Sequence, residues 1–493
     1  MRPAELLLKL VKSPTAQTTK PYTIAKSSLF AATGVPVAGF VDEAKVNFFG
    51  LETRVYVTEM KTVYVFDEVE LPEQLPDDRT IGRILSSAEK EYGRKEIDPY
   101  GVLGTEDERR HSIKTAIEIL ERKMTKRWRE HAPALARLLW RWYYAYGTIT
   151  PLFLTEGLGI TDVMLTMTDR AVTVDTYKHG AGLVTNIEPT LKDREHVQDA
   201  ISRRVAPLSA AKPFASRFDD LFRVRVTAIV PDIAPVQGYA FRLINVVWTA
   251  PLFVHMGGAE PWQMAYLCAQ WRKGRHVLVA GLPGSGKTSL LNAVLSCTQT
   301  TRRLAIIQSV PELFVPQAAF IATERVSFGA GISDILMAEL VQRFGLRANS
   351  DVGINELLTE SDVRAFVTIA FAGFGAGATI HAQSAEEVVL RLLRLGVTQA
   401  ELEALMPRLV IPVMEKAVTP RGVVRRAGRI YVPTPQVRRP TTREEALSHK
   451  PITKEEALKD PEVAKWEQII AEAAGTKTVH SPEAWVAYLK KFD

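Results

Sequence analysis

The chain has 493 residues, of which 46% are hydrophobic and 24% are charged. Its length is about three times that of a typical single domain, so we expect roughly two to four domains with several hydrophobic cores. The composition is that of an ordinary globular protein and excludes a disulfide-stapled miniprotein, a collagen-like chain and a wholly disordered chain. The net charge of +6 is small for this length and does not by itself indicate binding to nucleic acid.

The two cysteines, Cys268 and Cys297, form neither a CxxC metal knuckle nor a disulfide framework. We therefore expect both to be buried core residues of a protein in a reducing cytosol. The sequence contains no run of about 18 consecutive apolar residues, and the apolar run at residues 6–8 is too short for a signal peptide. It predicts no membrane span.

Residues 1–100 contain stretches in which polar and apolar residues alternate, as in Thr53–Val57 and Thr62–Phe66. This alternation is typical of strands with one buried face. It predicts a small β-rich accessory domain, and we find no catalytic constellation in it.

Apolar residues recur every three or four positions from Glu108 to Tyr146, which predicts helices, with a second helix starting near Pro133. Short strands follow, and a further helix is expected near residues 191–205. Residues 101–255 are therefore predicted to form an α+β domain.

The stretch from Arg109 to Trp142 carries ten Lys or Arg residues against three Glu residues, a local charge of +7. Long basic side chains routinely cover the solvent side of an amphipathic helix, which is the interpretation we favour. Binding to an anionic lipid surface or acidic partner, and binding to nucleic acid, are the alternatives that the sequence leaves open.

Residues 261–432 alternate between helical and strand patterns, as in a parallel sheet, and prolines after Val432 separate this segment from a tail. In the tail, capping boxes at Thr442 and Thr453 predict two helix starts, and Ser481 opens a third helix.

A phosphate-binding loop is the strongest motif. An apolar strand at residues 276–280 precedes the sequence GLPGSGKT at 281–288, and a helical stretch follows. This is the context that the GxxxxGK[ST] motif requires. Glycines in such a loop let backbone N–H groups converge on phosphate oxygens, at a helix N-terminus that favours anions. We expect Lys287 to contact the β and γ phosphates and Thr288 to bind Mg²⁺. The other expected nucleotide contacts are Gly281, Gly284, Ser285, Gly286 and Ser289.

A family resemblance extends around this loop. The stretch Tyr143–Leu152, the stretches near residues 160 and 180, and the sequence up to about Val432 resemble the secretion and pilus-assembly ATPases of the type II and type IV systems. Archaeal members that drive type IV pili and archaella are the most similar.

Two further motifs match that family. Thr379–Ala382 resembles its His box, so His381 is expected to sense the nucleotide or help to position water. The region from Leu346 to Glu356 resembles its Walker B region, which makes Glu356 the expected catalytic carboxylate. This second match is loose, because Gly353 interrupts the apolar strand.

The family's Asp box is altered. Members carry two acids before a Pro-Glu-Leu turn, whereas this chain has Gln308 and Ser309 before the same turn. Neither side chain supplies negative charge to Mg²⁺ or abstracts a proton. Glu312 would compensate only if the turn directs it inward. Slow hydrolysis, or hydrolysis only in an assembled ring, is therefore left open.

Three arginines match charged strands of the family, namely Arg242 and, before it, Arg223 and Arg225. A guanidinium that reaches phosphate from a mobile lobe or a neighbouring subunit would stabilise the transferred group. Strand-edge solubility or an internal ion pair is the alternative.

The resemblance implies an α/β fold with a RecA-like P-loop ATPase domain at residues 256–432. It would follow an α+β lobe at 101–255, with a β-rich extension at 1–100 and a helical C-terminal tail at 433–493. No zinc is expected, because members with a zinc-binding insertion carry four cysteines in CxxC pairs.

The implied activity is that of an ATPase motor that uses ATP and Mg²⁺ and forms a homohexamer. The implied partners are a polytopic inner-membrane platform protein and pilin-type subunits, so that the motor powers pilus-like assembly or type II/IV secretion. The expected location is cytoplasmic, peripheral at the inner face of the cell membrane. The alternatives are a DNA-transfer motor of the same superfamily, although nucleic acid is not favoured, and a weakly hydrolysing nucleotide-binding scaffold.

Overall fold

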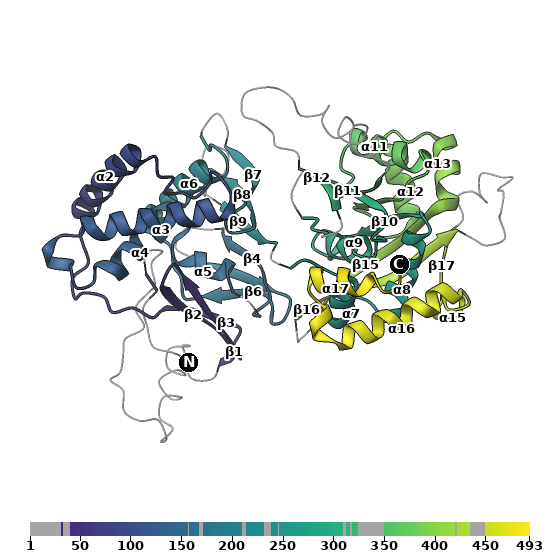
Figure 1. Ribbon diagram of the computed structural model, residues 1–493, viewed down its shortest axis with the longest axis horizontal. Coiled ribbons are helices and arrows are strands. Elements are labelled where there is room, and N and C mark those ends of the chain that lie inside the picture. Colours follow the sequence, from purple (N-terminus) through teal and green to yellow (C-terminus); the bar gives the residue numbers. More distant parts are fainter. Residues whose placement is uncertain are drawn as a thin grey trace, which may run out of the picture.

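The structure is a computed structural model of the chain. It describes residues 31–32, 40–155, 157–166, 171–209, 213–230, 238–244, 246–308, 312–315, 318–323, 350–419, 422–433 and 449–493. Two lobes lie side by side, each built on its own sheet (Figure 1).

The N-terminal lobe contains a nine-stranded sheet in the order β1-β2-β3-β6-β5-β4-β9-β8-β7. Its neighbouring strands are antiparallel, except that β3 pairs with β6 in parallel. The strands expected in an accessory domain thus continue the same sheet as those of the expected α+β lobe. Strand bounds are β1 Phe40–Phe48, β2 Leu51–Thr58, β3 Thr62–Asp67, β4 Ile160–Leu165, β5 Thr173–Thr176, β6 Gly180–Thr185, β7 Phe214–Asp219, β8 Val224–Ile229 and β9 Gly238–Leu243.

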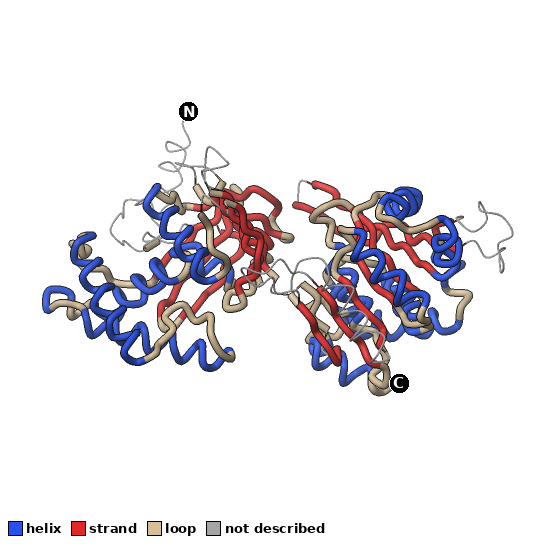
Figure 2. Tube along the Cα trace, turned by 90° about the horizontal axis from the view of Figure 1, so that it is seen from above, coloured by secondary structure: helices blue, strands red, loops and turns tan. Residues whose placement is uncertain are grey.

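The helices of this lobe gather on one side of the strands (Figure 2). One of them, α2, corrects the sequence analysis, which expected no helix before residue 100 although Ile81, Ile84, Leu85, Ala88 and Tyr92 follow a helical period. The bounds are α2 Asp78–Lys95, α3 Glu106–Lys123, α4 Ala132–Tyr144, α5 Thr150–Phe153 and α6 Leu191–Arg204, with short 3₁₀ helices at Lys126–Trp128 and Gly147–Ile149.

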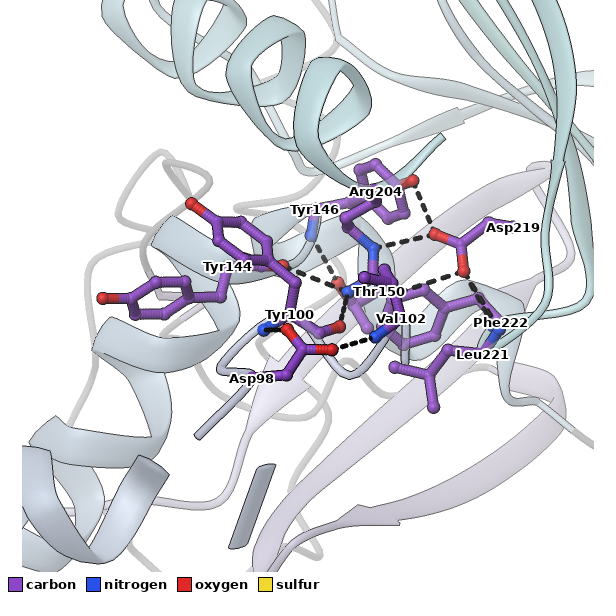
Figure 3. A network of polar contacts seen from close by, with 10 residues as sticks. All are labelled: Asp98, Tyr100, Val102, Tyr144, Tyr146, Thr150, Arg204, Asp219, Leu221 and Phe222. Carbon is purple, nitrogen blue, oxygen red and sulfur yellow. Dashed lines mark hydrogen bonds and ion pairs between the residues drawn. The ribbon is translucent and has the colours of Figure 1, made fainter. Parts of the chain in front are cut away.

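A buried ion pair joins α6 to β7 (Figure 3). Arg204 Nε lies 2.8 Å from Asp219 Oδ2, and the Tyr146 hydroxyl donates to the same oxygen at 2.7 Å. Although burial raises the pKa of Asp219, the Arg204 guanidinium and the Tyr146 hydroxyl hold it below its ordinary value. The network therefore fixes the sheet against the helices that cover it.

Much of the basic stretch is engaged within the lobe. Arg141 is buried and pairs with Asp67 at 2.7 Å, while Arg122 and Lys123 both reach Glu91, at 3.0 and 2.8 Å. These contacts reduce the charge available to an external polyanion.

The C-terminal lobe has an eight-stranded sheet in the order β12-β11-β13-β14-β10-β15-β16-β17. Strands β12 to β15 in this order run parallel, and β16 and β17 are added antiparallel. The bounds are β10 His276–Gly281, β11 Arg303–Gln308, β12 Ala318–Thr323, β13 Ser350–Ile354, β14 Ala376–Ile380, β15 Leu409–Thr419, β16 Gly422–Pro433 and β17 His449–Pro451.

Helices cover both faces of this sheet, as the apolar sequence of β10 requires. Val277 and Val279 enter a core with α8 and α9, and Leu278 and Ala280 enter a second core with α11 to α13. The helix bounds are α7 Ala250–His255, α8 Pro261–Arg272, α9 Lys287–Leu295, α11 Glu360–Phe371, α12 Ala385–Arg394 and α13 Gln399–Leu405, with a 3₁₀ helix at Met406–Arg408.

The described tail is helical and packs on this lobe. Its helices are α15 Lys454–Ala457, α16 Pro461–Gly475 and α17 Pro482–Leu489, with a 3₁₀ helix at Lys477–Val479. Thr453 forms the expected capping box and Ser481 caps α17, while the expected start at Thr442 lies outside the described residues. Trp466, Ile470 and Trp485 share a core with α8 and α9.

The structure corrects one expectation in this core. Cys268 on α8 and Cys297 just after α9 are both buried as expected, but they form a disulfide. The sequence separates them, and the packing of α8 against α9 brings them together.

Within the described residues, no helix combines the length and hydrophobicity needed to cross a membrane.

Candidate functional site

The site lies where parallel strands end. The carboxyl ends of β10, β11, β13 and β14 share one edge of the sheet, the usual place for ligands in such folds. The glycine-rich loop leads from β10 into α9. Gly284 and Gly286 have φ angles of 67° and 92°, which glycine adopts without the strain a side chain would cause.

Lys287, the first residue of α9, points along this edge. Its Nζ donates to Leu282 O at 3.1 Å and lies 3.2 Å from His381 Nδ1. Burial lowers the pKa of Lys287 to about 8, against the opposing effect of Glu356.

His381 and Glu356 complete a line of contacts. His381 follows β14, Glu356 lies two residues beyond β13, and His381 Nε2 is 2.5 Å from Glu356 Oε1. Burial and the charge of Lys287 lower the pKa of His381. In its neutral form, the ring accepts a hydrogen bond from Lys287 through Nδ1 and donates one to Glu356 through Nε2. Each of the three groups then has a hydrogen-bond partner.

Gly353 does not interrupt β13, contrary to the sequence analysis. A Cβ at this position would lie 2.6 Å from Leu295 Cδ1 and 2.9 Å from Ile306 Cδ1. The strand continues through the glycine because α9 packs into the space that a side chain would occupy.

The altered acidic box has a structural role. Gln308 is completely buried, and its Oε1 accepts from the backbone N–H groups of Glu312 and Leu313 at 3.0 and 2.8 Å. These bonds hold the backbone at residues 312–313, and the Glu312 side chain lies inward, with its Oε2 3.3 Å from Thr288 Oγ1. Carboxylate and hydroxyl oxygens are ligands suited to Mg²⁺.

The three predicted arginines lie at the other lobe. Arg242 is half exposed and pairs with Asp162 at 3.0 Å. Arg225 Nη1 is 3.6 Å from Glu312 Oε1, and Arg223 lies over the ring of Phe314, 4.6 Å from its centroid. Arg225 and Arg223 thus both reach the segment at residues 312–315, and Arg225 is the one that faces the carboxylate of Glu312.

The remaining predicted residues are partly described. Ser285 is completely buried against Gly281, and Ser289 lies in the first turn of α9. Ser309, Leu346 and Arg347 fall outside the described residues.

Arg425 is a further basic residue at the loop, and no sequence motif indicates it. Its Nε donates to Gly284 O at 2.8 Å, and the antiparallel pairing of β15 with β16 sets it opposite Lys416, whose Nζ also approaches Gly284. Only the register of a long hairpin brings these cations over the loop, and no local motif signals that register.

The chain has known relatives. Residues 224–420 match the model of a family described as "Type II/IV secretion system protein". An uncharacterized protein of Methanocaldococcus jannaschii is 30% identical over 140 residues, 28% of this chain and 52% of that protein. The type IV secretion system protein VirB11 of Bartonella quintana is 29% identical over 112 residues, 22% of this chain and 31% of VirB11. The matches thus span about half of the first relative and about a third of the second.

Among solved structures, the ATPase DotB of Legionella pneumophila is similar, with a TM-score of 0.42 and 15% sequence identity. That match covers 66% of this chain and 94% of DotB.

Proposed function

Residues 224–420 place this chain in the type II/IV secretion system protein family, and on that premise we propose that it is an ATP-hydrolysing motor for secretion or for assembly of a type IV pilus-like filament. The observation that carries the proposal is the line of contacts from Lys287 through His381 to Glu356 beside the phosphate loop. This line brings the proposed phosphate-binding lysine and the proposed catalytic carboxylate to one edge of the sheet, with His381 between them.

The loop would hold ATP through its backbone N–H groups and Lys287. Thr288 and Glu312 fit a magnesium ion, because their oxygens face each other at 3.3 Å. Mg²⁺, when bound, would neutralise charge on the β and γ phosphates. Entry of a triphosphate would draw Lys287 away from Leu282 O and His381.

Release of Lys287 would leave His381 and Glu356 facing the terminal phosphate. Glu356 is the carboxylate that would orient the attacking water and accept its proton, while His381 holds Glu356 in place through Nε2. His381 would thereby report on whether the terminal phosphate is present.

The motor would act as a RecA-like domain at residues 256–432 with a mobile lobe before it, in a homohexamer. Hydrolysis would change the approach of the two lobes and displace a polytopic membrane platform protein that handles pilin-type subunits. In this proposal the protein would act at the cytoplasmic face of the cell membrane.

The test measures ATP binding and steady-state hydrolysis for the full chain and two variants. Lys287→Ala should lose nucleotide binding, because its ammonium would contact the β and γ phosphates. Glu356→Gln should bind ATP as the unaltered protein does and hydrolyse it at least about a hundredfold more slowly. Normal turnover of Glu356→Gln would remove Glu356 from the catalytic role.

A weakly hydrolysing scaffold is the second candidate, favoured by the buried Gln308 in place of an acid. Tight ATP binding with turnover equal to that of Lys287→Ala, in the presence of the platform protein, would establish the scaffold and exclude the motor.

A further inference from the structure

Glu312 lies between the two lobes. Its Oε2 accepts from Thr288 Oγ1 at 3.3 Å, and its Oε1 is 3.6 Å from Arg225 Nη1 on β8 of the N-terminal lobe. The side chain is 16% exposed. One carboxylate therefore faces both the expected metal-binding hydroxyl and a cation of the opposite lobe.

Hydrogen bonds within the C-terminal lobe fix the position of Glu312. Gln308 accepts from its backbone N–H, and Asn292 Nδ2 on α9 donates to its carbonyl oxygen at 3.1 Å. Asn292 also accepts from the backbone N–H of Phe314 at 3.0 Å. Because Gln308 of β11 and Asn292 of α9 both hold the backbone at residues 312–314, the position of the Glu312 carboxylate beside Thr288 is fixed from two sides.

The electrostatics leave this carboxylate available to a cation. Oε1 is buried and makes no hydrogen bond among the described residues, and its approach to Arg225 is longer than a hydrogen bond. A carboxylate accepts only, and a small divalent cation prefers such an oxygen to an amide. Gln308, by contrast, uses its amide for the turn.

We propose that Glu312 supplies the carboxylate of the magnesium site, and that it does so in exchange for Arg225. The proposal rests on the function proposed above. Glu312 would hold the metal, directly or through a bound water, in place of the acids that this chain lacks at positions 308 and 309.

The exchange couples metal binding to the contact between lobes. Arg225 and the metal compete for one carboxylate, so binding of magnesium–ATP weakens the Arg225–Glu312 contact. Reciprocally, loss of the Arg225 charge strengthens metal binding, because coupling between two sites is mutual.

The experiment measures ATP affinity in the full chain with Mg²⁺ and with EDTA. We expect Glu312→Gln to weaken ATP binding in Mg²⁺ by about ten- to hundredfold, the usual effect of losing a group that orients or holds a metal. Its affinity in EDTA should be unchanged or slightly tighter, because a negative charge near the phosphates is removed. The amide keeps the shape of the side chain and leaves the backbone contacts of Gln308 in place.

Arg225→Gln should act in the opposite direction, with tighter binding in Mg²⁺ and no gain in EDTA. In the Glu312→Gln background the same change should have no effect on the magnesium dependence, which a double-mutant cycle measures. Glu360→Gln, an exposed position of the same lobe, is the control for loss of one negative charge. Electron paramagnetic resonance of Mn²⁺ bound with ATP provides a second readout, in which only Glu312→Gln should alter the metal signal.

If Mg²⁺ strengthens ATP binding by Glu312→Gln as much as it strengthens binding by the unaltered chain, the inference is overturned and the proposed ATPase function stands. An equal loss in Mg²⁺ and EDTA would also overturn it, since Glu312 would then act on the loop. Absence of ATP binding by the unaltered chain in both conditions would instead refute the proposed function itself.

Discussion

Gln308 makes hydrogen bonds to the backbone of Glu312 and Leu313. The amide of Gln308 both donates and accepts, with its Nε2 3.4 Å from Leu313 O and its Oε1 bound to two backbone N–H groups. A carboxylate could replace the acceptor but not the donor. The buried position therefore suits glutamine and excludes a metal-facing acid.

Gln308→Glu should accordingly destabilise the C-terminal lobe. A buried carboxylate oxygen would face Leu313 O without a proton between them, and leaving such a group unsatisfied costs about 1–3 kcal/mol. Urea unfolding at neutral pH measures the loss, which should shrink as the pH is lowered and the carboxyl becomes protonated. If Gln308→Glu is as stable as the unaltered chain or more stable, or hydrolyses ATP faster, then position 308 accepts an acid as a functional group.

The sequence was sufficient for the residues that belong to continuous motifs. Lys287 and Thr288 lie in the loop that their spacing predicts, and His381 meets Glu356 because the ends of β13 and β14 are neighbours. The inward direction of Glu312 and the placement of Arg425 depend on a turn and on a hairpin register. Packing between distant segments decides both, and neither leaves a local pattern.

Strand β10 illustrates how an element supports this site. Its alternate residues enter two cores, and it begins at His276, which is 1% exposed. Burial lowers the pKa of His276 to about 3, and Arg408 and Arg275 act in the same direction. The folded protein therefore keeps this imidazole neutral at a pH where the unfolded chain protonates it.

This difference predicts acid sensitivity. Between a pH of about 6.5 and about 3, the unfolded chain takes up a proton at His276 that the folded chain excludes, so stability is complete above this window and falls within it. The contribution of this one group is about 1.4 kcal/mol of unfolding free energy per pH unit. His276→Leu should reduce the pH slope by that amount in urea unfolding at a series of pH values. The exposed His111→Leu is the control, and equal slopes in all three proteins would contradict the prediction.

Elements differ in how well the sequence predicts them. The β10-loop-α9 unit and the capped helices α15 and α17 carry their signals in adjacent residues. Helix α2 carries a helical period, but the strand-like sequence before it led to a β-rich interpretation. The Cys268–Cys297 pairing follows from the packing of two helices, which residue spacing alone does not reveal.

At the scale of the whole molecule, the two lobes contact each other and the tail packs on the C-terminal lobe. The described contacts across the lobes include Arg225 with Glu312 and Arg223 with Phe314, whereas the tail is tied to the C-terminal lobe through its core. The tail therefore belongs to the same packed unit as α9, the helix that begins at the phosphate-binding loop.

This arrangement predicts that the tail stabilises the C-terminal lobe. Trp485 on α17 is completely buried, and its indole Nε1 donates to Ser296 O, one residue beyond α9, at 3.0 Å. Trp485→Ala should lower the unfolding free energy of this lobe by about 3–5 kcal/mol, the usual cost of removing a buried aromatic side chain. Intrinsic fluorescence and circular dichroism, recorded at increasing urea concentrations, would follow the unfolding of the C-terminal lobe.

Lys490→Ala, an exposed change on the residue after α17, should leave the same transition within about 0.5 kcal/mol. Because α9 begins at the phosphate loop, saturating ATP should recover part of the stability lost in Trp485→Ala, by binding only the folded lobe. If Trp485→Ala unfolds at the same urea concentration as Lys490→Ala, the tail does not support the lobe, and its burial against α9 has no energetic consequence for nucleotide binding.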